Sequence, residues 1–254
     1  INEMTPQLEE YFGKAIESIK TQKVVADKNY VVHTPQVKDF LESYDFGDLD
    51  VTLIENDGDS QFTSQINVAV EGIETDWFTI LEIDDEFSNI WIDNFKKYAE
   101  AYDDVEAFLP IVVDVNEGGE FLNFTNEAVW AMNFSDKMGY LDNGCLLKYQ
   151  NFQTSGVAFK KSSFEDIGGF KPSMKLTFVY EFLLRATYND KKIMTIPKVG
   201  YKHTNMRENS LFWNYRNKEQ EIVNPDEAKF WMDAAKKEYF FTTDRGIKYE
   251  PSLD

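Results

Sequence analysis

The sequence predicts an α/β fold, in which a mostly parallel central sheet carries helices on both faces. Segments with strand and helix patterns alternate through about residue 115, which is typical of such layered folds. Residues 77–81 form a near-continuous apolar run, as expected for a strand that is buried on both faces of its sheet. The chain has 254 residues, of which 43% are apolar, so it is long enough to bury a sizeable core.

The regular first part begins with a helix. Thr5 is placed to cap this helix and Pro6 to occupy its first position, and apolar residues then recur at helical spacing. Thr34 and Pro35 open a second helix in the same way. The other elements expected in this part are strands over 30–33, 51–54, 77–81 and 109–113, a turn over 56–59, a helix through Phe62, Ile66 and Val70, and a helix capped by Ser88.

The pattern loosens over residues 115–150, which carry several glycines and scattered aromatic residues but no long periodic run. Beyond them, the sequence predicts a helix over 178–188, a strand over 193–196 and a last helix that opens with the capping-box pattern at 224–227. We find no internal repeat and no linker. The simplest organisation is a single domain over residues 1–254, with a regular half at about 1–115 and a more elaborate half at about 116–254.

Composition narrows the classes of function. Lys and Arg number 26 and Asp and Glu number 45, which gives a formal net charge of −19. This balance argues against a nucleic-acid partner, because an extended phosphate contact needs clustered basic side chains. No apolar run is long enough to span a membrane, and no signal-peptide pattern is visible. The single cysteine, Cys145, fits a reducing compartment, and we expect a cytoplasmic protein.

The most informative segment is Leu81–Glu86, in which four carboxylates follow directly on the apolar run. Like charges at this spacing repel one another unless a cation or solvent compensates them. In open α/β sheets, ligands bind outside the carboxyl ends of the strands, where oxygen ligands suit a hard divalent cation such as Mg²⁺ or Mn²⁺. The alternative is a solvated acidic loop that supplies negative charge to the N-terminus of the next helix.

Five segments, taken in order, resemble the motifs of family 2 glycosyltransferases. Leu81–Glu86 is similar to the family's L-D-x-D-D segment, with Glu82 in place of the first Asp. The other four are Phe12–Gln22, similar to the family's first helix; Glu55–Gly58 followed by Asn67, similar to an N-x-G … N stretch; Gly156–Phe170, similar to an f-r-r … iGGF stretch; and Tyr201–His203 with Ser210, similar to a y-r-h … S tail. The order and spacing match over roughly residues 2–212.

This resemblance implies a GT-A-like, Rossmann-like fold and a metal-dependent glycosyltransferase. The donor would be a nucleotide-diphosphate sugar, the cofactor Mn²⁺ or Mg²⁺, and the acceptor a hydroxyl of a glycan, a protein or another molecule. Residues 1–115 would hold the nucleotide sugar and the metal, and residues 116–254 the acceptor. Asn2-Glu3 falls where the family has the loop after its first strand, so a nucleotide-binding strand is expected immediately before Ile1.

Four residues are the candidate metal ligands. Asp84 is the first choice for a direct ligand, and Glu82 and Asp85 are expected to assist directly or through water. The resemblance adds His203, and a neutral imidazole suits Mn²⁺. A lone histidine in a structural or solvated place is the alternative for His203.

The donor side has its own candidates. Lys202 and Arg207 flank His203, and we expect them to contact the diphosphate, because Arg matches phosphate oxygens with two parallel hydrogen bonds. Charge balance with the surrounding acidic residues is the alternative. The resemblance also places Asp57 and Asn67 in the donor-binding part. Five further candidates are His33 in the nucleotide pocket, a tight turn with close backbone approach at Gly168-Gly169, and the acceptor-side aromatics Trp130, Trp213 and Tyr215. An ordinary helix-ending turn is the alternative for the glycine pair.

The general base departs from the family pattern. Inverting members carry E-D-x-x-L-x-x-R, and aligning its Arg on Arg185 puts Phe178-Val179 at the acidic pair. Glu181 lies two residues beyond the usual Asp, which is a rotation of about 200° around a helix. Three outcomes are open: Glu181 serves as the base after a local shift, another carboxylate such as Asp166 serves, or the protein transfers poorly.

Three other classes of function compete with a glycosyltransferase. The first is a non-catalytic GT-A-like module that binds a nucleotide sugar or a glycan, because the usual base is out of place. A nucleotidyltransferase is disfavoured, since no Gly-rich basic loop that would hold a triphosphate is visible. A nucleic-acid-modifying transferase is disfavoured by the net charge of −19.

Overall fold

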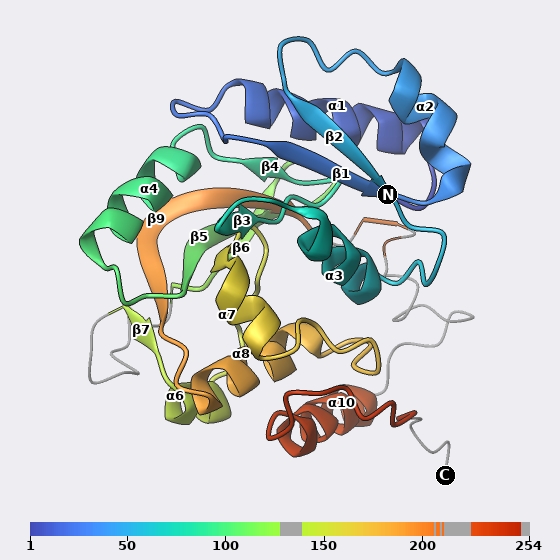
Figure 1. The fold of residues 1–254 in the computed structure, drawn as a ribbon. Helices are drawn as coiled ribbons and strands as arrows, with labels where there is room; N and C mark the ends of the chain where they lie inside the picture. The colour runs from blue at the N-terminus through green and yellow to red at the C-terminus, as the bar shows by residue number, and fades with distance from the viewer. Residues whose placement is uncertain (128–138, 206, 209, 211–224, 250–254) are drawn as a thin grey trace.

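The computed structural model describes residues 1–127, 139–205, 207, 208, 210 and 225–249. Helices and strands alternate along the chain and form layers around a central sheet (Figure 1). The helices are α1 (Pro6–Lys20), η1 (Pro35–Val37), α2 (Lys38–Ser43), α3 (Phe62–Gly72), α4 (Trp91–Ala101), α6 (Asn143–Lys148), α7 (Lys161–Asp166), α8 (Phe178–Tyr188) and α10 (Pro225–Glu238). The strands are β1 (Asn29–His33), β2 (Val51–Glu55), β3 (Trp77–Thr79), β4 (Glu86–Phe87), β5 (Ala107–Val115), β6 (Phe121–Thr125), β7 (Tyr140–Leu141), β8 (Ala158–Lys160) and β9 (Ile193–Thr204).

The main sheet is mixed, so the predicted mostly parallel sheet is wrong. Its seven strands follow the order β3-β8-β5-β9-β4, with β6 beside β5 and β7 beside β9. Among the described strands of this sheet, only β5 and β9 run parallel to each other, and β1 and β2 form a separate parallel pair. The reason lies in the connections: β6 follows β5 through the short turn at 116–120, and so short a connection permits only an antiparallel neighbour. An apolar run shows that a strand is buried but not which way it points.

Helices cover both faces of the main sheet, as predicted. Neighbouring residues of β5 enter different hydrophobic clusters, because successive side chains of a strand point to opposite faces. Phe108 packs with Trp91 of α4, whereas Leu109 packs in the cluster that contains Phe182 of α8 and Trp231 of α10. Each face of the sheet is therefore sealed by its own helical layer.

The N-terminal layer consists of α1, η1, α2 and the β1–β2 pair. Thr5 caps α1 as predicted, since its hydroxyl accepts the Leu8 N–H at 3.2 Å. Phe12 and Ile16 of α1 pack on Val37 and Leu41, which forms a hydrophobic cluster of its own. A cavity of about 1480 Å³ extends between this layer and β3 and reaches the acidic segment that follows β3.

Two element boundaries differ from the prediction in ways that shape the site. β3 ends at Thr79 rather than at residue 81, and β9 continues to Thr204 rather than ending at residue 196. The β5–β9 register shifts between Pro110 and Val112, which accommodates Pro197 in a bulge and allows pairing to resume. The extension of β9 carries its last residues to the end of β5.

One helix cap also differs, and a second is not described. Helix α4 begins at Trp91, three residues after the expected cap Ser88, whose backbone carbonyl instead accepts the Trp91 and Gln22 donors. The expected cap Asn224 lies outside the described residues, although α10 begins at Pro225.

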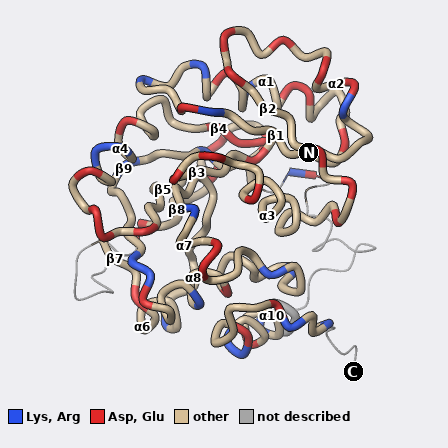
Figure 2. The backbone as a smooth tube through the Cα atoms, viewed as in Figure 1, with Lys and Arg blue, Asp and Glu red and all other residues tan. Residues whose placement is uncertain are grey.

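The negative charge is spread along the molecule. Figure 2 shows Asp and Glu on many elements with Lys and Arg interspersed, and a run of acidic residues between β3 and β4. Within the described ranges, no helix is both long and apolar enough to cross a bilayer.

Candidate functional site

The acidic segment forms a turn between β3 and β4. The Asp85 N–H donates to the Glu82 carbonyl at 3.2 Å, so the chain reverses here instead of continuing as a strand. A turn lets neighbouring side chains diverge, and the carboxylates of this segment take different partners. Glu82 and Asp85 meet His203 from β9, Asp84 meets Arg207, and Glu86 pairs with Lys202.

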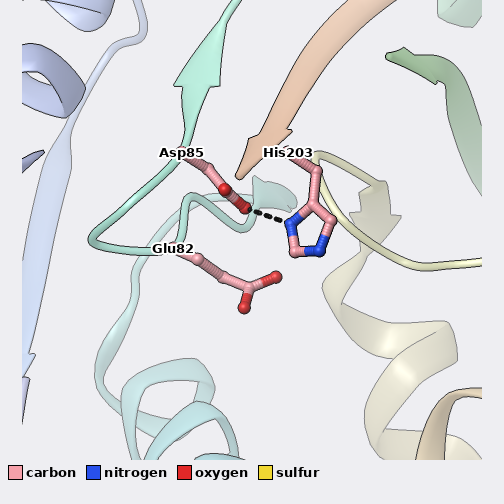
Figure 3. A group of neighbouring side chains, drawn as sticks. All are labelled: Glu82, Asp85 and His203. Atoms are coloured by element: carbon pink, nitrogen blue, oxygen red, sulfur yellow. Dashed lines mark hydrogen bonds and ion pairs between the residues drawn. The ribbon is translucent and has the colours of Figure 1, made fainter. Parts of the chain in front are cut away.

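Glu82, Asp85 and His203 form a compact trio of possible metal ligands (Figure 3). One donor atom from each residue lies within 4.8 Å of the others. Asp85 is fully buried and uses both oxygens: one accepts the Thr204 N–H at 2.7 Å, and the other contacts His203 Nδ1 at 3.0 Å. Glu82 accepts the Ser155 hydroxyl at 3.1 Å, and its carboxylate points toward the His203 ring.

Two members of the trio, Glu82 and His203, have strongly shifted pKa values. Burial raises the pKa of Glu82 to about 7, and the nearby Asp85 charge adds to the rise. Burial by itself lowers the pKa of His203, but the charge and hydrogen bond of Asp85, together with Glu82, raise it to about 10. Without a bound cation, the imidazolium therefore supplies positive charge to this acidic site at neutral pH.

This donor set fits a divalent cation. Carboxylate oxygens suit Mg²⁺ and Mn²⁺, and an imidazole nitrogen among them favours Mn²⁺. Asp85 holds Nδ1 of His203, which leaves Nε2 as the ring atom for a metal. Asp85 is thus placed either as a ligand or as the group that orients the imidazole.

Asp84, the first choice among the predicted ligands, lies outside this trio. Its Oδ2 is 2.5 Å from Nε of Arg207, and each of the two side chains is 12% exposed. Both line the cavity that also receives Glu82 and His203. The structure therefore places Arg207 beside the acidic segment with Asp84 as its partner, which is the charge balance that the sequence left open as the alternative to a diphosphate contact.

Four polar residues near the trio escaped the sequence prediction: Asp114, Gln153, Ser155 and Tyr201. Asp114 is the register partner of His203 across β5 and β9, and burial raises the pKa of its carboxyl. Gln153 donates to Asp114 at 3.2 Å and accepts from Ser155. Tyr201 accepts the Glu82 N–H at 3.0 Å. Asp114 could have been found from the sequence, because its carboxylate comes directly after the apolar run 107–113. The other three residues join the site through tertiary contacts that the sequence does not show.

The structure does not bring Lys202, Asp57 and Asn67 to the trio. Lys202 alternates with His203 along β9, so it faces the other way and pairs with Glu86. Asp57 is exposed in the turn after β2. Asn67 clamps the backbone of Phe170, accepting its N–H at 2.9 Å and donating to its carbonyl at 2.7 Å.

Glu181, a predicted base, lies in a buried ion-pair network. Its carboxylate takes two hydrogen bonds from Arg185, each at 2.9 Å, and Lys171 Nζ lies 2.9 Å from one oxygen. All three side chains have 0% exposure. Asp166, the other candidate, is a surface residue that pairs with Lys191 at 2.7 Å. Among the described residues, we therefore assign no general base at the position that the family's motif indicates.

The remaining residues singled out by the sequence are buried in the fold, form a turn, or lie outside the described residues. His33 is 2% exposed and its Nδ1 contacts the Thr34 carbonyl, and Cys145 is buried. Gly168 and Gly169 have φ values of +86° and +63° in the turn that directly ends α7, where the Gly168 N–H donates to the Glu165 carbonyl at 2.9 Å, so the helix-ending turn left open as the alternative is also present. Trp130, Trp213 and Tyr215 fall outside the described residues.

A mixed sheet between helical layers, with an acidic turn after β3, gives the chain a GT-A-like fold, which it shares with solved structures. Neither a protein-family model nor a curated protein sequence matches the chain. Solved structures do. TarS of S. aureus in complex with UDP-GlcNAc superposes with a TM-score of 0.65 at 14% identity, covering 91% of this chain and 63% of that one.

Two further solved structures are similar. TarS in complex with UDP gives a TM-score of 0.59 at 14% identity, over 78% of this chain and 57% of that one. The mannosyltransferase PcManGT of Pyrobaculum calidifontis, in complex with GDP-Man and Mn²⁺, gives 0.58 at 16% identity, over 82% and 57%. The chain thus spans 57–63% of the length of the chains in these three structures, and the likeness is one of fold.

Proposed function

We propose that the chain is a metal-dependent glycosyltransferase, which moves a sugar from a nucleotide-diphosphate donor to a hydroxyl of a carbohydrate or other acceptor. The observation that carries the proposal is the trio of Glu82, Asp85 and His203, of which Glu82 and His203 line the cavity. Its position in a fold shared with proteins solved with UDP-GlcNAc and with GDP-Man and Mn²⁺ supports a nucleotide-sugar donor.

The three residues of the trio would hold Mn²⁺ or Mg²⁺, of which the histidine favours Mn²⁺. The cation supplies positive charge against the negative charge that develops on the leaving nucleoside diphosphate. Asp85 orients His203 through Nδ1, and Ser155 orients Glu82. Tyr201 fixes the turn by accepting the Glu82 N–H. These contacts hold the ligands in place before a cation arrives, which lowers the cost of assembling the site.

A second candidate function is donor binding without transfer. The observation that favours it is the engagement of Glu181 by Arg185 and Lys171, which leaves no free carboxylate of the described residues in the position of the usual base. Both functions predict donor binding, and only the enzyme predicts turnover.

Calorimetric titration of UDP, GDP, CDP and TDP, each with Mn²⁺, Mg²⁺ or EDTA, tests the donor binding that both candidate functions predict. We expect one diphosphate to bind, and only with metal. The sugar nucleotides of that base are then incubated with the protein, and release of the nucleoside diphosphate is followed over time. Metal-dependent release supports the enzyme, binding without release supports the module, and the absence of any binding contradicts both.

A further inference from the structure

Asp84 differs from its acidic neighbours in what it contacts. Glu82 and Asp85 share His203, but Asp84 is not part of that group of ligand atoms and makes a short ion pair with Arg207 instead. Both partners are mostly buried at the wall of the same cavity. The Asp84 carboxylate therefore pairs with a guanidinium and is not free to bind a metal ion.

Arg207 is held in a way that leaves donor capacity for another ligand. Its Nε contacts Asp84 at 2.5 Å, and Nη1 reaches the Glu208 carbonyl at 3.3 Å. A guanidinium carries five N–H donors in a planar fork, which suits phosphate oxygens. Among the described residues, these two contacts use only part of that fork, and the side chain lines the cavity beside Glu82 and His203.

The other basic side chains along the described cavity wall are already committed. Lys28 pairs with Asp50 at 2.5 Å, and Lys96 lies 3.7 Å from Asp27. Lys28 and Lys96 lie in the part of the cavity formed by the segment before β1 and by α4, whereas Arg207 lies just beyond the end of β9, in the segment that follows His203. Arg207 is therefore the basic group of this wall that adjoins the trio.

We propose that Asp84 is a positioning residue, which holds Arg207 beside the trio so that the guanidinium binds the diphosphate of the donor together with the cation. This inference rests on the proposed function, because it assumes a nucleotide-diphosphate donor. A leaving diphosphate gains negative charge, and a fixed guanidinium next to the cation stabilises that charge without having to reorganise. An Arg side chain without a partner would first have to be ordered, which weakens binding.

Titration of Mn²⁺ alone separates a positioning residue from a metal ligand. We expect Asp84→Asn to bind Mn²⁺ as the wild-type protein does and Glu82→Gln to bind it far more weakly. Thermal unfolding checks that each variant is folded, and Asp84→Ser replaces Asp84→Asn if the latter is not. Loss of Mn²⁺ binding in a folded Asp84 variant overturns the proposal, because it makes Asp84 a ligand.

A double-mutant cycle on diphosphate affinity, with Mn²⁺ present, then tests the coupling. We expect Asp84→Asn to weaken binding about tenfold and Arg207→Gln about 10- to 100-fold, as for hydrogen bonds to charged groups. In the Arg207→Gln background, Asp84→Asn should weaken binding no further. Glu86→Gln is the matched control, because it removes a carboxylate of the same turn that pairs with Lys202, and it should leave the affinity unchanged.

The outcomes distinguish the two proposals. Additive effects of Asp84→Asn and Arg207→Gln overturn the positioning role but leave the proposed function standing. Failure of the wild-type protein to bind any of the four nucleoside diphosphates overturns both.

Discussion

Two residues of the trio, Glu82 and His203, make the stability of the metal-free protein depend on pH. Their folded-state pKa values are about 7 and about 10, against ordinary values of 4.5 and 6.5. Each group therefore binds its proton more tightly in the folded state than in the unfolded state. By linkage, both contributions to the free energy of unfolding fall as pH rises, Glu82 between about 4.5 and 7 and His203 between about 6.5 and 10.

Thermal unfolding of the wild-type protein and of Glu82→Gln in EDTA, from pH 4.5 to 7, measures the Glu82 part. The variant has no carboxyl to titrate, so we expect its melting temperature to fall less over this range than that of the wild-type protein. Parallel curves would contradict the raised pKa of Glu82. Saturating Mn²⁺ should reverse the trend, since a metal ion binds the deprotonated ligands.

Glu181 is expected to matter for stability rather than for turnover. Glu181→Gln leaves Lys171 and Arg185 as buried charges without their carboxylate, and breaking a buried pair in this way costs about 3–5 kcal/mol. Asp166→Asn is the matched control, because it breaks an exposed pair that is worth about 0–1 kcal/mol. Denaturant unfolding measures both changes. A stable Glu181→Gln with greatly reduced turnover would instead restore Glu181 as the base.

At the scale of elements, the turn after α7 joins three parts of the chain. Gly168 has a φ of +86°, and a Cβ there would lie 2.0 Å from the Thr242 carbonyl oxygen. Gly169 packs against Asn67, whose amide clamps Phe170 and so ties α3 to this turn. The glycine pair that the sequence singled out therefore brings α3, α7 and the segment after α10 together.

Gly168→Ala should destabilise the protein by about 3 kcal/mol or more, because the new methyl group meets backbone that cannot move aside cheaply. Gly119→Ala is the matched control: its φ is +79°, but no atom lies within 4 Å of the added Cβ. That variant should lose only about 1 kcal/mol from the unfavourable φ. Urea unfolding compares the two, and equal losses would show that the close approach to Thr242 does not hold in solution.

Element boundaries could be predicted where a local signal marks them. The Thr5-Pro6 pair marks the start of α1, and the apolar pattern marks α8 over the predicted residues 178–188. β9 could not be predicted in full, because Pro197 reads as a strand end. Pairing with β5 and a bulge carry the strand past this proline, and that extension delivers His203 to Asp85.

For the molecule as a whole, the cavity of about 1480 Å³ between the N-terminal layer and β3 offers a site where a bound ligand would stabilise the folded state. A ligand that binds only the folded state at 100 times its Kd stabilises the protein by about 2.7 kcal/mol. For a chain of this size, this corresponds to a rise in melting temperature of about 5–10 °C. We expect this rise with the correct nucleoside diphosphate and Mn²⁺, and its loss in EDTA.

Salt dependence checks the same measurement against non-specific binding. A cation held by buried carboxylates is screened less than surface charges are, so the shift should persist at high ionic strength. A shift that vanishes with salt, or that inorganic phosphate reproduces without Mn²⁺, would contradict a specific site.

The sequence by itself determined the class of fold, the helical layers and the chemistry of the acidic turn, because these depend on local patterns of apolar, capping and charged residues. It also identified Glu82, Asp85 and His203 as candidates. Tertiary structure decided which basic partner each acidic residue contacts. Asp85 contacts His203, Asp84 pairs with Arg207, and Glu181 lies in a buried ion pair. It also decided the strand directions. Both depend on contacts between segments that lie far apart in the chain, which no local pattern encodes.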